Sequence, residues 1–273
     1  MLKFRVKTIS SRDNPIVRDY RELASEPDAS AARLLLDGAH LVREAHAARM
    51  EFESVAVAAS RLAEPTEEGE LARALEAEGI PVLNVIDEVF AAMSPVRTPS
   101  GIIAIAERTP VDASTIWNTR NGFTLVAIDV QDPGNVGALV RTAEAGGVTG
   151  VVVSGASANP FSWKALRGSM GSSIRLPVAR APEVGIIVDW IQASGTRAIA
   201  SVARGGKAPD EIDWSGPIAL FIGGEGPGLP EAVVGRCDDL VTIPMAPRVE
   251  SLNVSVAAAV LIYEARRRRL PPS

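Results

Sequence analysis

Hydrophobic positions form two different patterns, one before about residue 108 and one after about residue 121. In the second pattern, runs of valine, isoleucine and leucine predict strands at 124–130, 150–155, 174–180, 197–202, 217–223 and 240–245. Segments of helical spacing separate or follow them at 135–146, 162–171, 182–194, 229–236 and 252–269. Near-continuous apolar strands separated by helices are typical of a mostly parallel sheet covered on both faces. We therefore expect an α/β fold with an open parallel sheet.

The first pattern predicts a smaller α/β unit. Its predicted helices are 16–23, 31–50 and 67–78, and its predicted strands are 53–58, 80–85 and 102–106, with a turn at 95–101. Polar residues then fill the stretch before Gly122. We predict an N-terminal domain at 1–107, a connection at 108–121 and a C-terminal domain at 122–273.

Composition narrows the class of protein. The chain has 273 residues, 47% hydrophobic and 22% charged, which is ordinary for a globular protein with a real core. No apolar run reaches the roughly 20 residues that a membrane helix needs, and the N-terminus lacks the apolar centre of a secretory signal. Cys237 stands alone, and His40 and His46 are the only histidines. We expect a cytoplasmic protein with no membrane segment, internal disulfide or metal site.

Charge is unevenly distributed. The net charge is −5, which argues weakly against a nucleic-acid partner. Residues 1–111 hold 13 basic and 18 acidic side chains, and 112–273 hold 15 of each. Two local basic groups leave phosphate contact open, with a solvated helix end as the alternative for the second. They are Lys3, Arg5, Lys7, Arg12, Arg18 and Arg21, and the run at 266–269.

Polar residues follow the predicted strand at 124–130. Asn135 stands where a helix begins, so it is either a plain N-cap or a site residue. Arg141 lies further along that helix among apolar residues. An arginine in such a setting needs an anionic partner, so we expect a phosphate or carboxylate on the ligand.

Two later segments add candidates. Glycines at 223, 224, 226 and 228 surround Glu225, and they allow a ligand close to the backbone or simply form a turn. The loop lacks the P-loop Lys-Ser/Thr pair and the dinucleotide spacing. Ser251 is a candidate N-cap for a helix starting at Leu252, whose small residues at 257–259 suit core packing or a subunit contact. Ligands bind beyond the carboxyl ends of strands in such sheets, so we expect one composite pocket and an enzyme.

Together these segments resemble the SpoU class (TrmH-like) of the SPOUT methyltransferases. The similar blocks are NVGALVRTAEAGG, FIGGEGPGL and IPMAPRVESLNVSVAAAVLIYE, with ALRGSMGSSIRLPV between them. The resemblance covers residues 122–267, and DGAHLVREA and PSGIIAIAE are similar to the family's small substrate-binding domain. One departure is Ala246-Pro247-Arg248, where the family often has a glycine.

The resemblance implies transfer of a methyl group from S-adenosyl-L-methionine to a ribose 2′-hydroxyl of RNA. It also implies a trefoil-knotted C-terminal domain, a homodimer, and cofactor binding near Gly223, Gly224, Ile243 and Leu252. The resemblance implies that Arg141 is the catalytic residue, acting either as proton acceptor or by placing a phosphate. Because a guanidinium is a poor base, we favour the phosphate role.

By the same resemblance the remaining site residues would support Arg141. We expect Asn135 and Ser251 to orient the arginine and substrate, and Asn253 to support its loop. We expect Glu225 to pair with Arg141 or to place cofactor or RNA.

Because many family members that act on ribosomal RNA carry such an N-terminal domain, the resemblance favours ribosomal RNA as the substrate, with transfer RNA as the alternative. A catalytically degenerate RNA-binding protein and a nucleotide-dependent oxidoreductase are the rival functions. The first is disfavoured because all five catalytic candidates are present, and the second because the glycine-rich loop follows a late strand.

Overall fold

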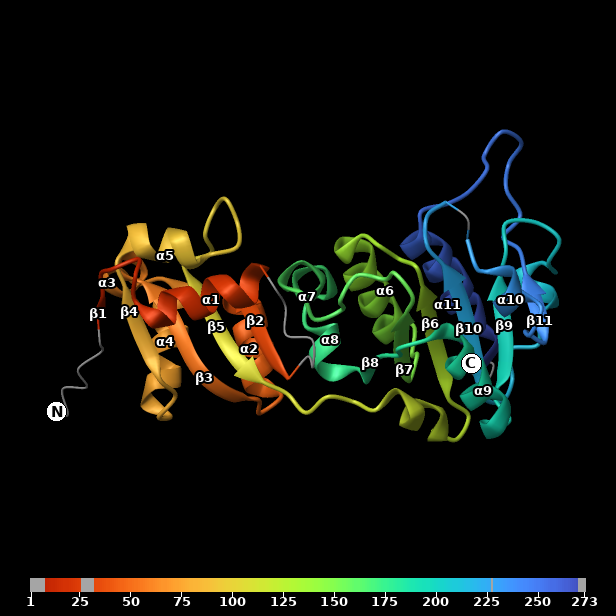
Figure 1. Cartoon of the computed structure of the whole chain (residues 1–273), viewed down its shortest axis with the longest axis horizontal. Helices are drawn as coiled ribbons and strands as arrows, with labels where there is room; N and C mark the ends of the chain where they lie inside the picture. The colour runs from red at the N-terminus through yellow and green to blue at the C-terminus, as the bar shows by residue number, and fades with distance from the viewer. Residues whose placement is uncertain (1–7, 26–31, 227, 270–273) are drawn as a thin grey trace. The chain divides into compact units, whose positions relative to one another are not determined.

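The computed structural model describes residues 8–25, 32–226 and 228–269, which form two compact units (Figure 1). The N-terminal unit comprises Met1–Pro110 and Phe161–Ile174, and the C-terminal unit comprises Val111–Pro160 and Arg175–Ser273. The chain therefore leaves the C-terminal unit once and returns to it. Across the described ranges, none of the helices is both long and apolar enough to cross a membrane. The basic residues Lys3, Arg5 and Lys7 lie outside these ranges.

The N-terminal unit is built on a mixed five-stranded sheet. In spatial order its strands are β1 (Thr8–Ile9), β4 (Val82–Val85), β3 (Glu51–Ala58), β5 (Ile102–Glu107) and β2 (Arg33–Asp37). Strand β5 runs antiparallel to β2 and β3, whereas the other pairings are parallel. One face packs against α1 (Pro15–Ser25) and α5 (Asp87–Met93). Figure 1 shows α2 (Ala39–Ala47) and α4 (Glu67–Ala77) on the other face, and α3 (Ala59–Ala63) precedes α4.

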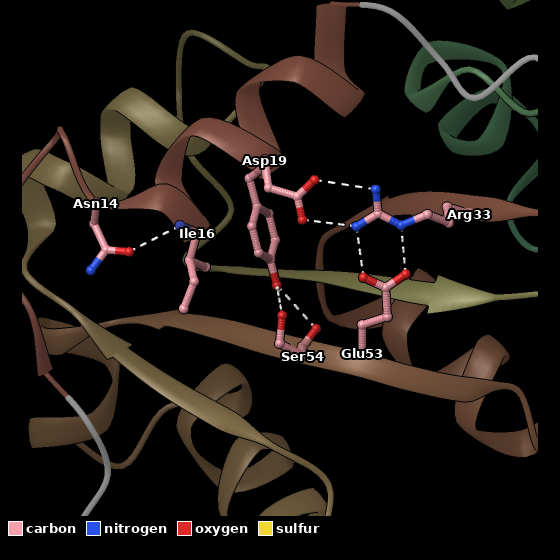
Figure 2. Close-up of polar contacts among 7 residues, drawn as sticks. Asn14, Ile16, Asp19, Arg33, Glu53 and Ser54 are labelled. Atoms are coloured by element: carbon pink, nitrogen blue, oxygen red, sulfur yellow. Dashed lines mark hydrogen bonds and ion pairs between the residues drawn. The ribbon is translucent and has the colours of Figure 1, made fainter.

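Polar contacts hold α1 on this sheet (Figure 2). The buried Tyr20 hydroxyl donates to the carbonyl oxygen of Ser54 at 3.0 Å and lies 2.9 Å from its Oγ. Arg33 donates through Nη2 to Asp19 at 2.8 Å and to Glu53 at 2.6 Å. Burial raises the pKa of the Tyr20 hydroxyl above its ordinary value. One guanidinium thus joins α1, β2 and β3.

The prediction of a single helix at 31–50 is wrong. From residue 32, where the described chain resumes, it contains β2 and then α2, separated by Gly38 at φ 97°. Leu34, Leu35 and Leu36 are all buried, and β2 pairs antiparallel with β5. Tertiary pairing therefore overrides the helical spacing of this run. The other predicted elements of this unit are confirmed to within two residues at each end, whereas β1, α3 and α5 were not predicted.

The unit boundaries differ from the predicted domains in two places. The division falls between Pro110 and Val111, and η1 (Ala113–Asn118) places Ile116 and Trp117 in the core of the C-terminal unit. The second difference is Phe161–Ile174, which groups with the N-terminal unit. Within that segment α7 (Trp163–Ser169) packs against β2, and an ion pair of 3.2 Å joins Arg167 to the buried Asp37. Burial raises the pKa of Asp37.

The C-terminal unit contains the predicted parallel sheet. Its spatial order is β11 (Asp239–Val241), β9 (Arg197–Ser201), β10 (Ile218–Gly223), β6 (Phe123–Ile128), β7 (Gly150–Ser154) and β8 (Val178–Arg180). All its pairings are parallel. Every residue of β6 and β7 is buried, as a sheet covered on both faces requires.

Helices cover this sheet. One face packs against η1 and α9 (Val184–Ser194). The helices α6 (Pro133–Ala145) and α11 (Val254–Arg269) pack against each other and contact β7 and β10 respectively. Two short elements, η2 (Pro209–Glu211) and α10 (Glu231–Val234), complete the unit. The parallel α/β prediction is confirmed.

Two predicted strands of this unit are shorter than expected. The segment 174–180 begins with the end of α8 (Ser172–Arg175), so only its last residues, β8, join the sheet. The segment 240–245 leaves the sheet after Val241, where the N–H of Thr242 turns to the carbonyl of Lys207. The remaining strands and helices of the unit agree with the prediction to within two residues.

A glycine at the end of α6 tests the packing of α6 on α11. A Cβ on Gly146 would lie 2.0 Å from Cγ2 of the fully buried Ile262, so Gly146→Ala is expected to destabilise the protein by about 1–3 kcal/mol. Gly185→Ala is the matched control, because its Cβ would meet no atom within 4 Å and helix propensity favours alanine by about 0.5–1 kcal/mol. Thermal melting measures both variants. Combining Gly146→Ala with Ile262→Ala should cost less than the sum of the two, and strict additivity would contradict the close contact.

Candidate active site

Three loops meet at the carboxyl ends of the central strands in the C-terminal unit. Strands β6 and β10 are parallel neighbours, with Gly223 opposite Ile128, so the loops that follow them leave the sheet together. The N–H of Gly224 donates to the carbonyl of Ile128 at 2.7 Å. The third loop, 242–253, leads from β11 into α11. The order of the strands in the sheet therefore explains why the loops of the predicted composite site lie close together.

Side chains from the three loops form one hydrogen-bonded cluster. Asn135 Nδ2 donates to Glu225 Oε1 at 2.7 Å. Asn253 Nδ2 donates to Asn135 Oδ1 at 3.1 Å and lies 3.4 Å from Glu225 Oε1. In the sequence, Glu225 lies 90 positions after Asn135, and Asn253 lies 118 positions after it. The structure therefore brings together three of the five predicted catalytic residues.

Backbone segments pack closely together at the end of β10, next to this cluster. A Cβ on Gly224 would lie 1.8 Å from the carbonyl oxygen of Asp129, and one on Gly223 would lie 2.3 Å from the backbone of Gly228. Asp129 itself has a φ of 57°, and its Oδ1 accepts the N–H of Ala156 at 2.7 Å. Neither glycine can carry a side chain without movement of the backbone, so here their role is close approach.

A cavity of about 190 Å³ adjoins the cluster. All four predicted cofactor residues line it, together with Glu225 and Ser251. Gly226 and Gly228, which the sequence also indicated, line it as well, whereas eight other lining residues were not predicted: Ser201, Val202, Ala203, Ile222, Met245, Glu250, Val254 and Ala257. The first three lie at the end of β9 and directly after it. Because β9 neighbours β10, only knowledge of the sheet order would have found them.

The charge of this cavity restricts its ligand. Glu225 and Glu250 both line it, and its described lining contains no lysine, arginine or histidine. A phosphate-bearing nucleotide would meet only carboxylates here, whereas a cationic ligand would be attracted. Among the described residues, no three His, Cys, Asp or Glu side chains gather as a metal site requires.

Both helix caps differ from the expected ones. Asp132 caps α6 by accepting the N–H of Asn135 at 2.8 Å, so the amide of Asn135 is free for the cluster. Asn253 Oδ1 accepts the N–H of Ser255 at 2.9 Å, so Asn253 is the residue that caps α11 and Ser251 is not. Asn253 therefore has two roles, since its Oδ1 orders the helix and its Nδ2 binds the cluster.

Arg141 does not lie in the expected apolar setting. It is exposed on α6, and its side chain has no hydrogen-bond or ion-pair partner among the described residues. The expected pairing with Glu225 is also absent there, since Glu225 accepts from the two asparagines. Six residues beyond Asn135, the helix has turned by about 600°, which places Arg141 on a different face.

The run at 266–269 is largely engaged within the protein. Arg267 and Arg268 bind Glu264 at 2.7 and 2.9 Å, and they lower the pKa of that carboxyl to about 2. Arg269 donates to the carbonyls of Trp214 and Gly216, both at 2.7 Å, and its pKa is lowered by burial. These contacts favour the structural interpretation of the run over phosphate binding.

One loop residue occupies a conformation that favours glycine. Arg248 has a φ of 78°, in the left-handed region, which costs a residue with a side chain about 1–2 kcal/mol. The loop from β11 to α11 therefore makes a glycine-type turn with arginine in it.

Comparison with known proteins decides the family. A sequence profile of the SpoU rRNA methylase family matches residues 122–263, which contain all the site residues described above. The chain belongs to the SpoU rRNA methylase family. A second profile, of the MRM3-like substrate binding domain, matches residues 14–104. The predicted family and fold class are thereby confirmed, as a parallel-sheet methyltransferase domain with an N-terminal substrate-binding domain.

Relatives of this SpoU chain match it along nearly its whole length. An uncharacterised tRNA/rRNA methyltransferase of Synechocystis is 34% identical over 266 residues, covering 97% of this chain and 95% of its own. The 23S rRNA (guanosine(2553)-2′-O)-methyltransferase RlmP of Bacillus subtilis is 31% identical over 262 residues, covering 96% and 100%. The crystal structure of AdoMet-bound rRNA methyltransferase from Sinorhizobium meliloti has a TM-score of 0.84 at 29% identity, covering 98% and 100%.

The two helix caps lead to a stability prediction. Asp132→Ala should lower the free energy of unfolding by about 0.5–2 kcal/mol, because it removes the N-cap of α6. Asn135→Ala removes only exposed side-chain bonds and should cost less. Chemical denaturation of both variants measures the difference. A larger loss for Asn135→Ala would mean that the asparagine, not Asp132, holds the start of the helix.

Proposed function

We propose that this SpoU-family protein transfers a methyl group from S-adenosyl-L-methionine to a ribose 2′-hydroxyl of ribosomal RNA. The observation that carries the proposal is the cavity beside the Asn135–Glu225–Asn253 cluster. It occurs in a chain similar over nearly its full length to a protein named as a 23S rRNA 2′-O-methyltransferase. Transfer RNA remains the alternative substrate, and a cytoplasmic location follows if ribosomal RNA is the target.

The cavity fits S-adenosylmethionine chemically. Backbone at Gly223 and Gly224 lies open to an adenosine moiety, and Ile243 and Leu252 supply apolar wall. The carboxylates of Glu225 and Glu250 favour a ligand that carries a sulfonium and an ammonium group. When bound, the cofactor supplies an electrophilic methyl carbon. A related structure contains AdoMet, which supports this assignment.

The site residues would align the ribose and stabilise charge. A guanidinium stays protonated in proteins, so we assign Arg141 to binding the phosphate beside the target ribose and polarising its 2′-hydroxyl. Asn135, held by Glu225 and Asn253, would orient the substrate, and Ser251 would contact it from the rim of the cavity. Alignment of an in-line displacement is the main contribution that these groups make.

We also propose a homodimer with a trefoil-knotted C-terminal domain, as the family resemblance implies. An apolar stripe on α11 supports the dimer: Val256, Val260 and Tyr263 are 48, 41 and 52% exposed and lie three to four residues apart. Helix α11 packs on α6, which carries the exposed Arg141, so a second copy on this stripe would lie near the site. Three loops converging on one cavity are consistent with a knot that binds the cofactor.

Arg141 is tested by substitution. Arg141→Ala should reduce tritium transfer from labelled cofactor onto unmodified ribosomal RNA by about 100-fold or more, the usual loss for a transition-state charge donor. Cofactor affinity, measured by calorimetry, should be unchanged because Arg141 does not line the cavity. Arg141→Lys should retain more activity than the alanine variant if the role is phosphate binding. Arg236→Ala, which removes an exposed arginine paired with Asp189, is the control.

The outcomes separate the rival functions. Full activity of Arg141→Ala would overturn its assignment. Saturable cofactor binding by the wild-type protein without transfer would mean that the substrate is another RNA or an assembly intermediate, and no cofactor binding at all would support the degenerate RNA-binding alternative.

Glu250 tests the charge argument. Glu250→Gln should weaken S-adenosylmethionine binding by about fivefold, because one solvent-screened charge pair is worth about 1 kcal/mol. Binding of S-adenosylhomocysteine, whose sulfur is uncharged, should change less. Glu231→Gln, an exposed carboxylate on α10 outside the cavity lining, is the matched control. Equal weakening of both ligands would show that Glu250 acts through shape and not charge.

A further inference from the structure

A second hollow lies entirely within the N-terminal unit. It has a volume of about 490 Å³ and lies between the last turns of α1 and the end of α5. Met93 and Pro95 give it apolar wall, and Trp163 of α7 closes one side. We call this hollow the α1–α5 groove. It shares no residue with the cofactor cavity.

The α1–α5 groove gathers positive charge in an acidic part of the chain. Arg18 and Arg21 both line it and are exposed, and Glu22 is the one carboxylate in its described lining. The Nζ of Lys164 lies 5.4 Å from the ring centroid of Trp163. The Arg21 guanidinium has no partner among the described residues, and Arg18 donates only to the carbonyl of Asp13 at 3.3 Å. Residues 1–111 carry 13 basic and 18 acidic side chains, so this concentration of cations is local.

Trp163 is held in place while still facing the groove. It is half-buried and packs on the core cluster of the N-terminal unit, which includes Met93. Because the core already holds the Trp163 side chain in place, a ligand that stacks on its ring would cost it little further conformational entropy. Proteins recognise unpaired RNA by stacking bases on aromatic side chains and binding the adjoining phosphates with arginine or lysine.

We propose that the α1–α5 groove binds an unpaired nucleotide of the RNA substrate. The base would lie against Trp163, and the adjoining phosphates would contact Arg18 and Arg21. The inference rests on the proposed function, which supplies an RNA substrate, and it adds a second contact point away from the cofactor cavity. The match of residues 14–104 to a substrate binding domain supports it, although Trp163 lies outside that match.

The direct test is binding of short RNA to the full-length protein. Fluorescence anisotropy would follow eight-nucleotide oligoadenylate and oligouridylate, and an RNA duplex of equal length. Trp163→Leu keeps apolar bulk but loses the aromatic face, and should weaken single-strand binding by about 5- to 150-fold, the range for stacking one base. Trp163→Phe should retain most of the affinity. Arg18→Gln with Arg21→Gln should reduce the slope of log Kd against log salt by about 1.4, or about 0.7 for each phosphate contact.

The control is Arg73→Gln, which removes one exposed arginine from α4 in the same unit and should leave affinity and salt slope unchanged. Equal binding of wild type, Trp163→Leu and the double arginine variant would overturn the groove, as would preference for duplex. If Trp163→Leu fails to fold by circular dichroism, the arginine pair and Trp163→Phe decide the question. Methyl transfer onto ribosomal RNA, measured in parallel, separates the two hypotheses. If the wild-type protein transfers methyl groups but the groove variants bind RNA normally, the groove proposal is wrong and the proposed function stands. If the groove variants lose RNA binding but the wild-type protein transfers no methyl group, the groove proposal stands and the proposed function is wrong.

Discussion

The site depends on how closely the ends of β6 and β10 approach each other. Where Gly224 passes the carbonyl of Asp129, an added Cβ would be 1.8 Å from the oxygen, and the N–H of the same glycine bonds Ile128. This contact continues the sheet one residue beyond the strands. It brings Glu225 within 2.7 Å of Asn135, although the two are 90 positions apart. A residue with a side chain at position 224 would push the two strand ends apart and separate the cluster from the cavity. The geometry of the site therefore depends on this backbone packing.

The charged residues at the cofactor cavity and those proposed to contact RNA are opposite in sign, as the two ligands of the proposed reaction require. The cofactor cavity has carboxylates at Glu225 and Glu250, and a sulfonium compound is cationic. RNA is anionic, and the exposed cations Arg141, Arg18 and Arg21 lie outside that cavity lining. An overall net charge of −5 conceals this separation. Since screened interactions act over about 10 Å, local charge decides recognition more than net charge does.

The sequence was sufficient to predict elements whose signal is local, and insufficient where partners lie far along the chain. Strand β6 is recognisable because five of its six consecutive residues are apolar, Thr124 being the exception. The segment at 31–50 was predicted as one helix, yet pairing with β5 makes its residues 33–37 a strand. Asn135 was a reasonable N-cap candidate from its position, but Asp132 accepts the capping bond, and a sequence offers both. The exposure of Arg141 follows from helix phase relative to the sheet, which requires the packed structure.

The same limit explains Trp163, and it bears on how the RNA-binding and methyl-transfer residues are connected. Profiles and periodicity assign this tryptophan to the methyltransferase part of the chain, whereas its packing places it in the N-terminal unit. The segment that carries it begins after β7 and ends before β8, two neighbouring strands of the methyltransferase sheet. A nucleotide bound against Trp163 would therefore act on a segment covalently attached at both ends to that sheet. The proposed groove and the methyltransferase sheet are thus linked along the chain by both ends of this segment as well as by the connection after Pro110.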